Sequence, residues 1–204
     1  MSMTIDYKIN PLFSTPLFVF SDFITEEERV KIYHSIKKVN HFPHKAITGN
    51  ATSTHGQKVV DFLDREITDR IQSALDECNH EYGGFSTKLH LIWSNIQMKG
   101  SVLTEHTHPD SSLSGSLYIN ANDGLFFHNP NPYVYFTSKN KSTIFNCEYA
   151  KFPVKNCQLL IFPSWLRHGK NDLINEMDDR VVVSFNASLC SYGLAQWSST
   201  KGTS

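Results

Sequence analysis

Four residues with metal-binding side chains could act together: His106, His108, Asp110 and, sixty residues after His108, His168. Imidazole nitrogen is a good ligand for divalent transition metals. Two His and one carboxylate, with other positions left open, form the usual ligand set for Fe(II) that must also bind oxygen. The set His108, Asp110 and His168 has that composition. The structural alternative is that these are ordinary hairpin residues, since such polar residues are common in turns.

The spacing of these residues allows two ligand sets. Alternate residues of a strand point to the same face, so His106 and His108 share a face, and Asp110 joins them if the strand continues past Pro109. One set is His108, Asp110 and His168. The other replaces Asp110 with His106 and gives an all-His site of the cupin type. The preference of oxygen-activating iron for a carboxylate favours Asp110.

A possible anion-binding residue, Arg180, follows His168 by twelve positions. It opens an alternating segment in which Arg180 and Ser184 share one face. If that face is the interior of a barrel, a buried guanidinium is costly unless an anion meets it. An Arg with a hydroxyl nearby is suited to clamp a carboxylate. The alternative is a solvent-exposed Arg180 that pairs with Asp178 or Asp179.

The elements that must position these residues change character at Gly83. Before it, a capping box at Thr25 and an apolar stripe over Asp64–Cys78 predict two helices, and Gly49–Lys58 is expected to be a loop. After it, alternating apolar segments predict strands. One further short strand, Pro11–Phe20, is expected before the helices. The strands expected after Gly83 are Lys88–Met98, Leu113–Asn120, Gly124–His128, Tyr133–Phe136, Thr143–Tyr149, Gln158–Phe162 and Arg180–Leu189. This order predicts a mainly β fold with supporting α-helices, a cupin-like double-stranded β-helix or jelly roll.

Composition limits the kind of protein this chain can be. Its 204 residues are typical of one domain, 1–204, with helical support over about 1–84 and a β-helix core over about 85–190. A net charge of −1 argues against binding to nucleic acid. No apolar run is long enough to span a membrane. The four cysteines lack C-x-x-C spacing, so we expect free thiols in the cytoplasm, the host's cytoplasm if the protein is viral. A homodimer remains possible.

Several motifs together resemble the Fe(II)/2-oxoglutarate-dependent oxygenases, over about residues 88–190. The motifs that carry the resemblance are His108-x-Asp110, Leu117–Asn120, Gly124–Phe127 with the proline turn after it, Phe152-Pro153, Leu159–Ser164 before His168, and Arg180. Three further segments are similar to a small group of such oxygenases found in phages and marine bacteria: Ser114-Gly115, Phe162–Leu166 and Ser184–Asn186.

The resemblance implies iron at His108, Asp110 and His168, with His106 as an extra candidate metal ligand. It also implies that Arg180 binds the distal carboxylate of 2-oxoglutarate, with Tyr118 and Ser184 as further candidates for contacts with this co-substrate. The implied activity is a dioxygenase, a hydroxylase that uses O2 to oxidise a C–H bond of a small molecule or peptide and releases succinate and CO2. The alternative is a non-catalytic cupin-like module that binds a metal or ligand, which has no need for an internal Arg180.

Overall fold

The largest element is a six-stranded antiparallel sheet, in a computed structural model that describes residues 14–57, 61–131, 143 and 145–190. The order of its strands is β1-β9-β6-β10-β4-β3, and two small sheets pair β2 with β5 and β7 with β8. The strands are β1 Phe18–Phe20, β2 Ile47–Thr48, β3 Ala51–Ser53, β4 Thr87–Gln97, β5 Val102–Leu103, β6 Leu113–Asn120, β7 Gly124–His128, β8 Tyr149–Pro153, β9 Leu159–Pro163 and β10 Arg180–Leu189. The helices are α1 Glu26–Ile36 and α2 Arg65–Glu81.

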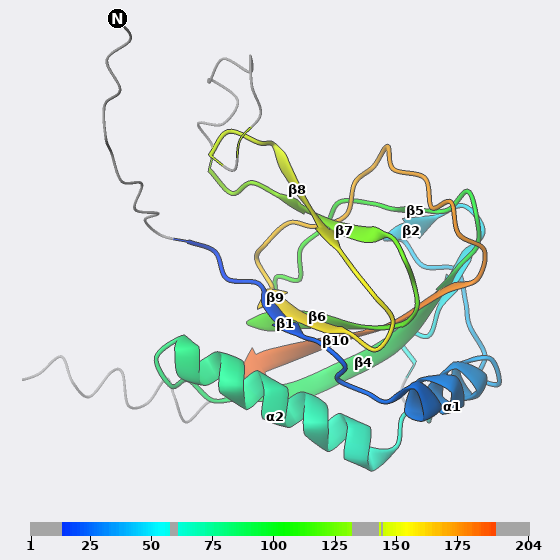
Figure 1. The fold of residues 1–204 in the computed structure, drawn as a ribbon, viewed down its shortest axis with the longest axis horizontal. Coiled ribbons are helices and arrows are strands. Elements are labelled where there is room, and N and C mark those ends of the chain that lie inside the picture. Colours follow the sequence, from blue (N-terminus) through cyan, green and yellow to red (C-terminus); the bar gives the residue numbers. More distant parts are fainter. Residues whose placement is uncertain (1–13, 58–60, 132–142, 144, 191–204) are drawn as a thin grey trace, which may run out of the picture.

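Both helices cover the same face of the large sheet (Figure 1). Helix α1 begins at the predicted capping box, in which the Thr25 side chain accepts from the Glu28 backbone N–H and the Glu28 carboxylate accepts from the Thr25 N–H. The apolar stripe of α2 and alternate residues of β6, β9 and β10 form one continuous core, with Leu75, Leu117 and Val183 fully buried. This layer makes the sheet a rigid support for the residues on its other face.

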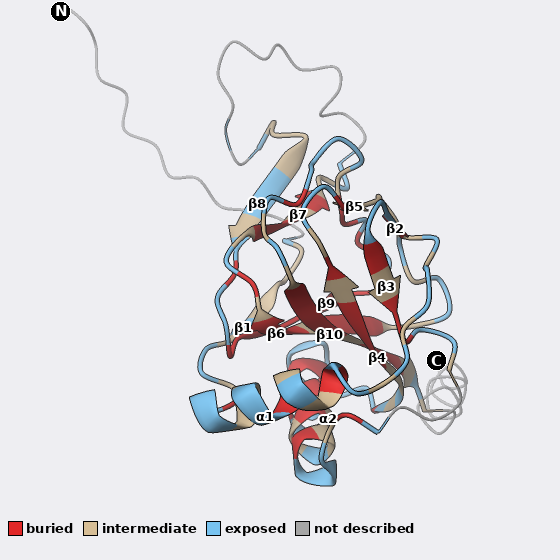
Figure 2. Cartoon of the chain, turned by 90° about the vertical axis from the view of Figure 1, so that its right-hand side faces the viewer, coloured by how far each residue is buried: buried red, intermediate tan, exposed pale blue. Residues whose placement is uncertain are grey.

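The opposite face of the sheet is covered by the β7–β8 hairpin and the β2–β5 pair (Figure 1). A second apolar cluster fills part of the space beneath them, where Leu125, Phe127 and Phe162 pack together, and Figure 2 shows how far the central strands are buried. Two layers of antiparallel strands around an interior are the architecture of the double-stranded β-helix. The fold class predicted from the sequence is therefore confirmed.

Two expected elements were wrong, and one cannot be compared. The expected loop over residues 49–58 contains β3, because Ala51–Ser53 pairs with the outer edge of β4. The expected strand Thr143–Tyr149 is instead a turn, closed by a hydrogen bond from the Cys147 N–H to the Thr143 carbonyl at 2.9 Å, and β8 begins only at Tyr149. The expected strand Tyr133–Phe136 lies outside the described residues.

Neither α1 nor α2, in the described part of the chain, has the length and apolar character needed to span a bilayer. All four cysteines are free thiols, as expected.

Candidate metal centre

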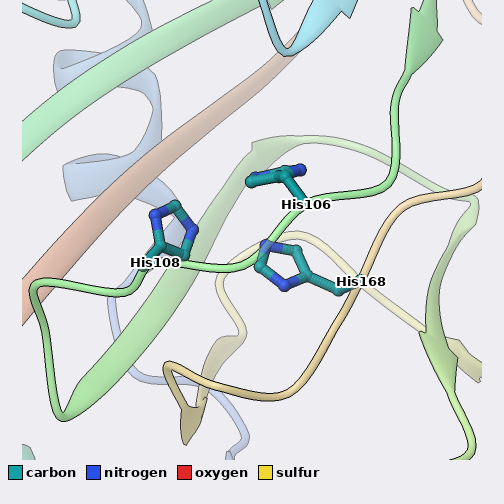
Figure 3. Close-up of side chains that lie close together, drawn as sticks. All are labelled: His106, His108 and His168. Carbon is teal, nitrogen blue, oxygen red and sulfur yellow. The ribbon is translucent and has the colours of Figure 1, made fainter.

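Three imidazole rings converge on the face of the sheet opposite the helices (Figure 3). His106, His108 and His168 each offer one ring nitrogen, and these three atoms all lie within 4.8 Å of one another. The ring centroids of His106 and His168 are 4.3 Å apart, and those of His108 and His168 are 5.2 Å apart. Three converging imidazole nitrogens are a donor set that suits a divalent transition metal such as iron.

Backbone pairing brings the ligand-bearing segments together. The His106 N–H donates to the His168 carbonyl at 3.0 Å, and the His168 N–H donates back to the His106 carbonyl at 3.1 Å. The His108 N–H donates to the Ser164 carbonyl, at the end of β9. Gly169 allows this close approach, since its φ is +90° and an added Cβ would lie 2.5 Å from the Thr104 carbonyl oxygen.

Hydrogen bonds hold the rings in defined orientations. His106 Nδ1 lies 2.8 Å from the Thr104 carbonyl oxygen, and His168 Nδ1 lies 3.0 Å from that of Leu166. Because a carbonyl only accepts, each Nδ1 carries the proton and each Nε2 keeps its lone pair for a metal. His108 Nδ1 faces the side-chain amide of Asn186 at 3.4 Å.

Burial keeps these imidazoles neutral, which is the form that binds a metal. Loss of hydration and, to a smaller extent, the neighbouring imidazole of His106 lower the pKa of His108 to about 4. For the same reason the pKa of His168 lies well below its usual range, and that of His106 is also lowered. The site can therefore accept a cation at neutral pH without first losing a proton.

The structure does not bring Asp110 into this group, although the sequence analysis favoured it over His106. The chain turns at Pro109 and Asp110, where the Ser111 N–H donates to the His108 carbonyl at 3.2 Å. Asp110 is exposed, and its backbone carbonyl accepts from the Ser188 hydroxyl. The strand alternation needed to place its carboxylate beside His108 ends before this turn.

A cavity of about 300 Å³ adjoins the three histidines and extends along the sheet. Arg180, Tyr118 and Ser184 all line it, so the predicted co-substrate residues and the three imidazoles share one space. The remaining lining includes the apolar side chains of Leu125 and Phe162. This mixture of apolar walls and a few polar groups is typical of small-molecule sites.

Arg180 is 6% exposed and has partners inside the protein. Its Nε donates to Asp123 Oδ1 at 3.0 Å, and its Nη1 donates to Gln97 Oε1 at 2.6 Å. The expected alternative, a solvent-exposed Arg180 paired with Asp178 or Asp179, is wrong. Asp123 and Gln97 were missed by the sequence analysis because only the pairing of β4 with β10 places Gln97 opposite Arg180.

The two further candidates lie beside Arg180. Tyr118 is 1% exposed, the Arg180 guanidinium carbon lies 5.9 Å from its ring centroid, and burial raises the pKa of its phenol. The Ser184 hydroxyl accepts from Asn95 Nδ2 at 3.2 Å. Asn95 Oδ1 is buried with no hydrogen-bond partner in the described structure, although Asn95 lines the cavity. A bound molecule that donates a hydrogen bond would satisfy it.

A family model and several solved structures are similar to this chain. Residues 91–186 match a family model described as "Putative 2OG-Fe(II) oxygenase". HygX from Streptomyces hygroscopicus, solved with nickel and 2-oxoglutarate bound, has a TM-score of 0.59 and 10% identity, covering 85% of this chain and 83% of its own. The viral collagen prolyl hydroxylase of Paramecium Bursaria Chlorella virus-1, in a 2-oxoglutarate complex, has a TM-score of 0.53 and 14% identity, covering 84% and 96%.

A Pseudomonas putida prolyl-4-hydroxylase has a TM-score of 0.54 and 13% identity, covering 86% of this chain and 94% of its own. A search of curated proteins gave no match. Residues 91–186 are thus similar to the 2-oxoglutarate-Fe(II) oxygenases by family model, and the resemblance seen in the sequence is confirmed. The narrower likeness to a phage and marine bacterial group stays a prediction.

Proposed function

We propose that the protein is a dioxygenase that uses Fe(II), 2-oxoglutarate and O2 to hydroxylate a C–H bond of an organic substrate. The observation that carries this proposal is that three neutral imidazoles and a buried guanidinium line one cavity. The first group suits a divalent metal, and the second suits a carboxylate. The matching family model supports the same assignment.

His106, His108 and His168 are the residues that would hold the metal, with His106 and His168 acting through Nε2. Arg180 would bind the distal carboxylate of 2-oxoglutarate, and Tyr118 and Ser184 are candidates for further contacts with this co-substrate. Bound iron and 2-oxoglutarate, together with O2, supply the oxidising power, so that the substrate gains one oxygen atom as a hydroxyl while 2-oxoglutarate becomes succinate and CO2.

The chain itself would hold the Arg180 side chain in a fixed orientation and limit the access of water to the cavity. Asp123 and Gln97 fix the Arg180 side chain in its position against the Tyr118 ring, which reduces the entropy lost when a carboxylate binds. Since Asp123 already balances the charge of Arg180, burial of this Arg does not by itself require a ligand. Leu125, Phe162 and the buried Val182 form apolar walls that limit the access of water to the site.

One observation favours a second candidate, the cupin-like binding module. In the described residues the clustered donors are imidazoles alone, without the carboxylate expected at an oxygen-activating iron site. A metal or small ligand could bind there without turnover. This module would bind a metal but would not consume 2-oxoglutarate.

Succinate release separates the two functions. The protein is incubated with Fe(II), ascorbate, O2 and 2-oxoglutarate, with a panel of amino acids, peptides and nucleosides, and succinate is measured by NMR. The oxygenase predicts succinate above the level of His168→Ala, and with a true substrate an equal amount of hydroxylated product. Metal binding with no succinate and no 2-oxoglutarate binding would support the binding module instead.

A further inference from the structure

The outer part of the cavity is lined by a second group of basic side chains, His44, Lys45 and His55, which we call the basic rim. Lys45 and His55 are exposed and His44 is half-buried, whereas His168 and Arg180 at the inner part are buried. The rim is thus positioned to meet a molecule that enters the cavity. The proposed metal ligands and co-substrate contacts do not include any of its residues.

Rings connect the basic rim to the metal centre. The ring centroids of His44 and His55 are 4.7 Å apart, and those of His55 and Trp93 are 4.9 Å apart. Trp93 in turn lies 5.9 Å from His108. A substrate held at the rim and lying along the Trp93 indole would therefore reach the metal ligands without crossing another wall of the cavity.

The lining carries no negative charge to balance the rim. Among the described residues that line the cavity, none is Asp or Glu, while Lys45 and Arg180 are cations. Arg180 has Asp123 as a partner, but Lys45 forms no ion pair within the described part of the chain. A cavity lined by one sign of charge concentrates counter-ions of the opposite sign.

The basic rim is built on paired backbone. Ile47 and Thr48 form β2 against β5, and the Thr104 N–H and hydroxyl both donate to the Ala46 carbonyl, at 2.9 and 3.0 Å. On the other side, Phe42 and Ser53 exchange two backbone hydrogen bonds just before His55. The first segment is therefore fixed against the strand that leads to His106, and the second is fixed through β3 to β4.

The hydrogen bonds of His44 define what it can offer a ligand. Its Nδ1 accepts from the Ala46 backbone N–H at 3.2 Å, so the proton of the neutral ring is on Nε2. Partial loss of hydration lowers the pKa of both His44 and His55, so both rings are neutral at neutral pH. His44 Nε2–H then acts as a neutral donor beside the ammonium of Lys45, and donors with one cation are a suitable set for an anion.

We propose that the basic rim binds an anionic group, a carboxylate or a phosphate, of the primary substrate. The substrate class is a small organic acid, or the acidic end of a larger molecule, whose reacting carbon lies beside Trp93. This inference rests on the proposed function, because it places that acid together with 2-oxoglutarate in one cavity. The 2-oxoglutarate site at Arg180 and the substrate site at Lys45 are separate.

A binding experiment with small aromatic molecules, two of them acids and one neutral, tests the proposal. The protein, loaded with Zn(II) and saturating 2-oxoglutarate, is titrated by calorimetry with benzoate, with phenyl phosphate and with neutral benzamide. We expect at least one of the two acids to bind at least tenfold more tightly than benzamide. Comparison of the two acids then identifies the preferred anion. Lys45→Ala should weaken acid binding at least tenfold and Lys45→Arg should retain it, while Lys88→Ala, which removes an exposed lysine of β4, should change nothing.

Three results would overturn the proposal: equal affinity for benzamide and both acids, no acid binding, or unchanged acid binding in Lys45→Ala. Displacement of 2-oxoglutarate by the acids would also overturn it, because they would then occupy the Arg180 site. Failure of the proposed function gives a different result, since 2-oxoglutarate itself would not bind to the Zn(II)-loaded protein before any acid is added.

Discussion

His106 and His168 are joined by two reciprocal backbone hydrogen bonds, of 3.0 and 3.1 Å, although 62 residues separate them in the chain. Their ring centroids lie 4.3 Å apart. The paired backbones fix both imidazoles before any metal arrives, so binding a metal costs little reordering. This relationship favours His106, and not Asp110, as the third ligand.

Single substitutions distinguish the two ligand sets. We expect His106→Ala, His108→Ala and His168→Ala each to lose at least 100-fold in Fe(II) affinity, since each removes a donor from a three-ligand site. Asp110→Ala should keep the affinity of the wild type, because its side chain is exposed at a turn. Anaerobic Fe(II) titration measures the affinity, and circular dichroism checks the fold. Loss of iron in Asp110→Ala with retention in His106→Ala would restore the set with the carboxylate.

Asn186 should tune the affinity of the metal without binding it. Its amide lies 3.4 Å from His108 Nδ1, and it accepts from the Ser114 hydroxyl at 2.8 Å. Residues that orient a metal-ligating His typically contribute ~10–100-fold in metal affinity. We expect a loss in this range for Asn186→Ala, measured by the same titration. Ser188→Ala, two positions along β10, is the matched control and should leave the affinity unchanged.

Gly169 should be required for the site as well as for stability. Replacing a glycine at positive φ costs about 1–2 kcal/mol in backbone strain. Gly84→Ala, with φ +83° and nothing within 4 Å of an added Cβ, should show that cost alone in urea unfolding. Gly169→Ala adds a clash with the Thr104 carbonyl, so it should lose more stability and also weaken Fe(II) binding. Equal stabilities and unchanged iron affinity would show that the two ligand-bearing segments can separate freely.

Arg180 should control the affinity for 2-oxoglutarate. Charge-assisted hydrogen bonds to a carboxylate contribute ~1.5–3 kcal/mol each, so Arg180→Ala should raise the dissociation constant of 2-oxoglutarate roughly ten- to several-hundred-fold. Arg180→Lys should recover part of this loss, because it keeps the charge without the planar fork. Iron affinity should hardly change.

Removing Arg180 also leaves Asp123 without its partner, which lowers stability by itself. Asp123→Asn with Arg180 intact is therefore the control. It should lower stability through the lost ion pair while retaining most of the affinity for 2-oxoglutarate. Equal affinity in all of these proteins would remove Arg180 from the site.

Local signals in the sequence were sufficient to predict most of the main helices and strands. The capping box at Thr25 and the alternating segments Leu113–Asn120 and Arg180–Leu189 predicted the elements observed there. The strand β3 was missed because Ala51–Ser53 is short and polar and pairs only through its contact with β4. Such pairing depends on residues more than forty positions away, which local periodicity does not contain.

The candidate site was only partly predictable for a related reason. The apolar run before His168 predicted the strand β9, which ends at Pro163, and the turn after it brings His168 beside His106 and His108. The choice between His106 and Asp110 depended on where the strand alternation stops, and Pro109 was the signal that it stops early. Asp123 reaches Arg180, and the basic rim reaches the cavity, through turns and strand pairing, so their sequence neighbours gave no indication of a shared site.

The most direct test of the account is an anaerobic titration of 2-oxoglutarate into the Fe(II)-loaded protein, followed by visible absorption. The account predicts that a weak charge-transfer band appears as 2-oxoglutarate binds beside the iron, in the wild type and equally in Asp110→Ala. The band should be absent in His106→Ala and should require much more 2-oxoglutarate in Arg180→Ala. A wild-type protein that binds iron but shows neither the band nor any 2-oxoglutarate binding would contradict the account.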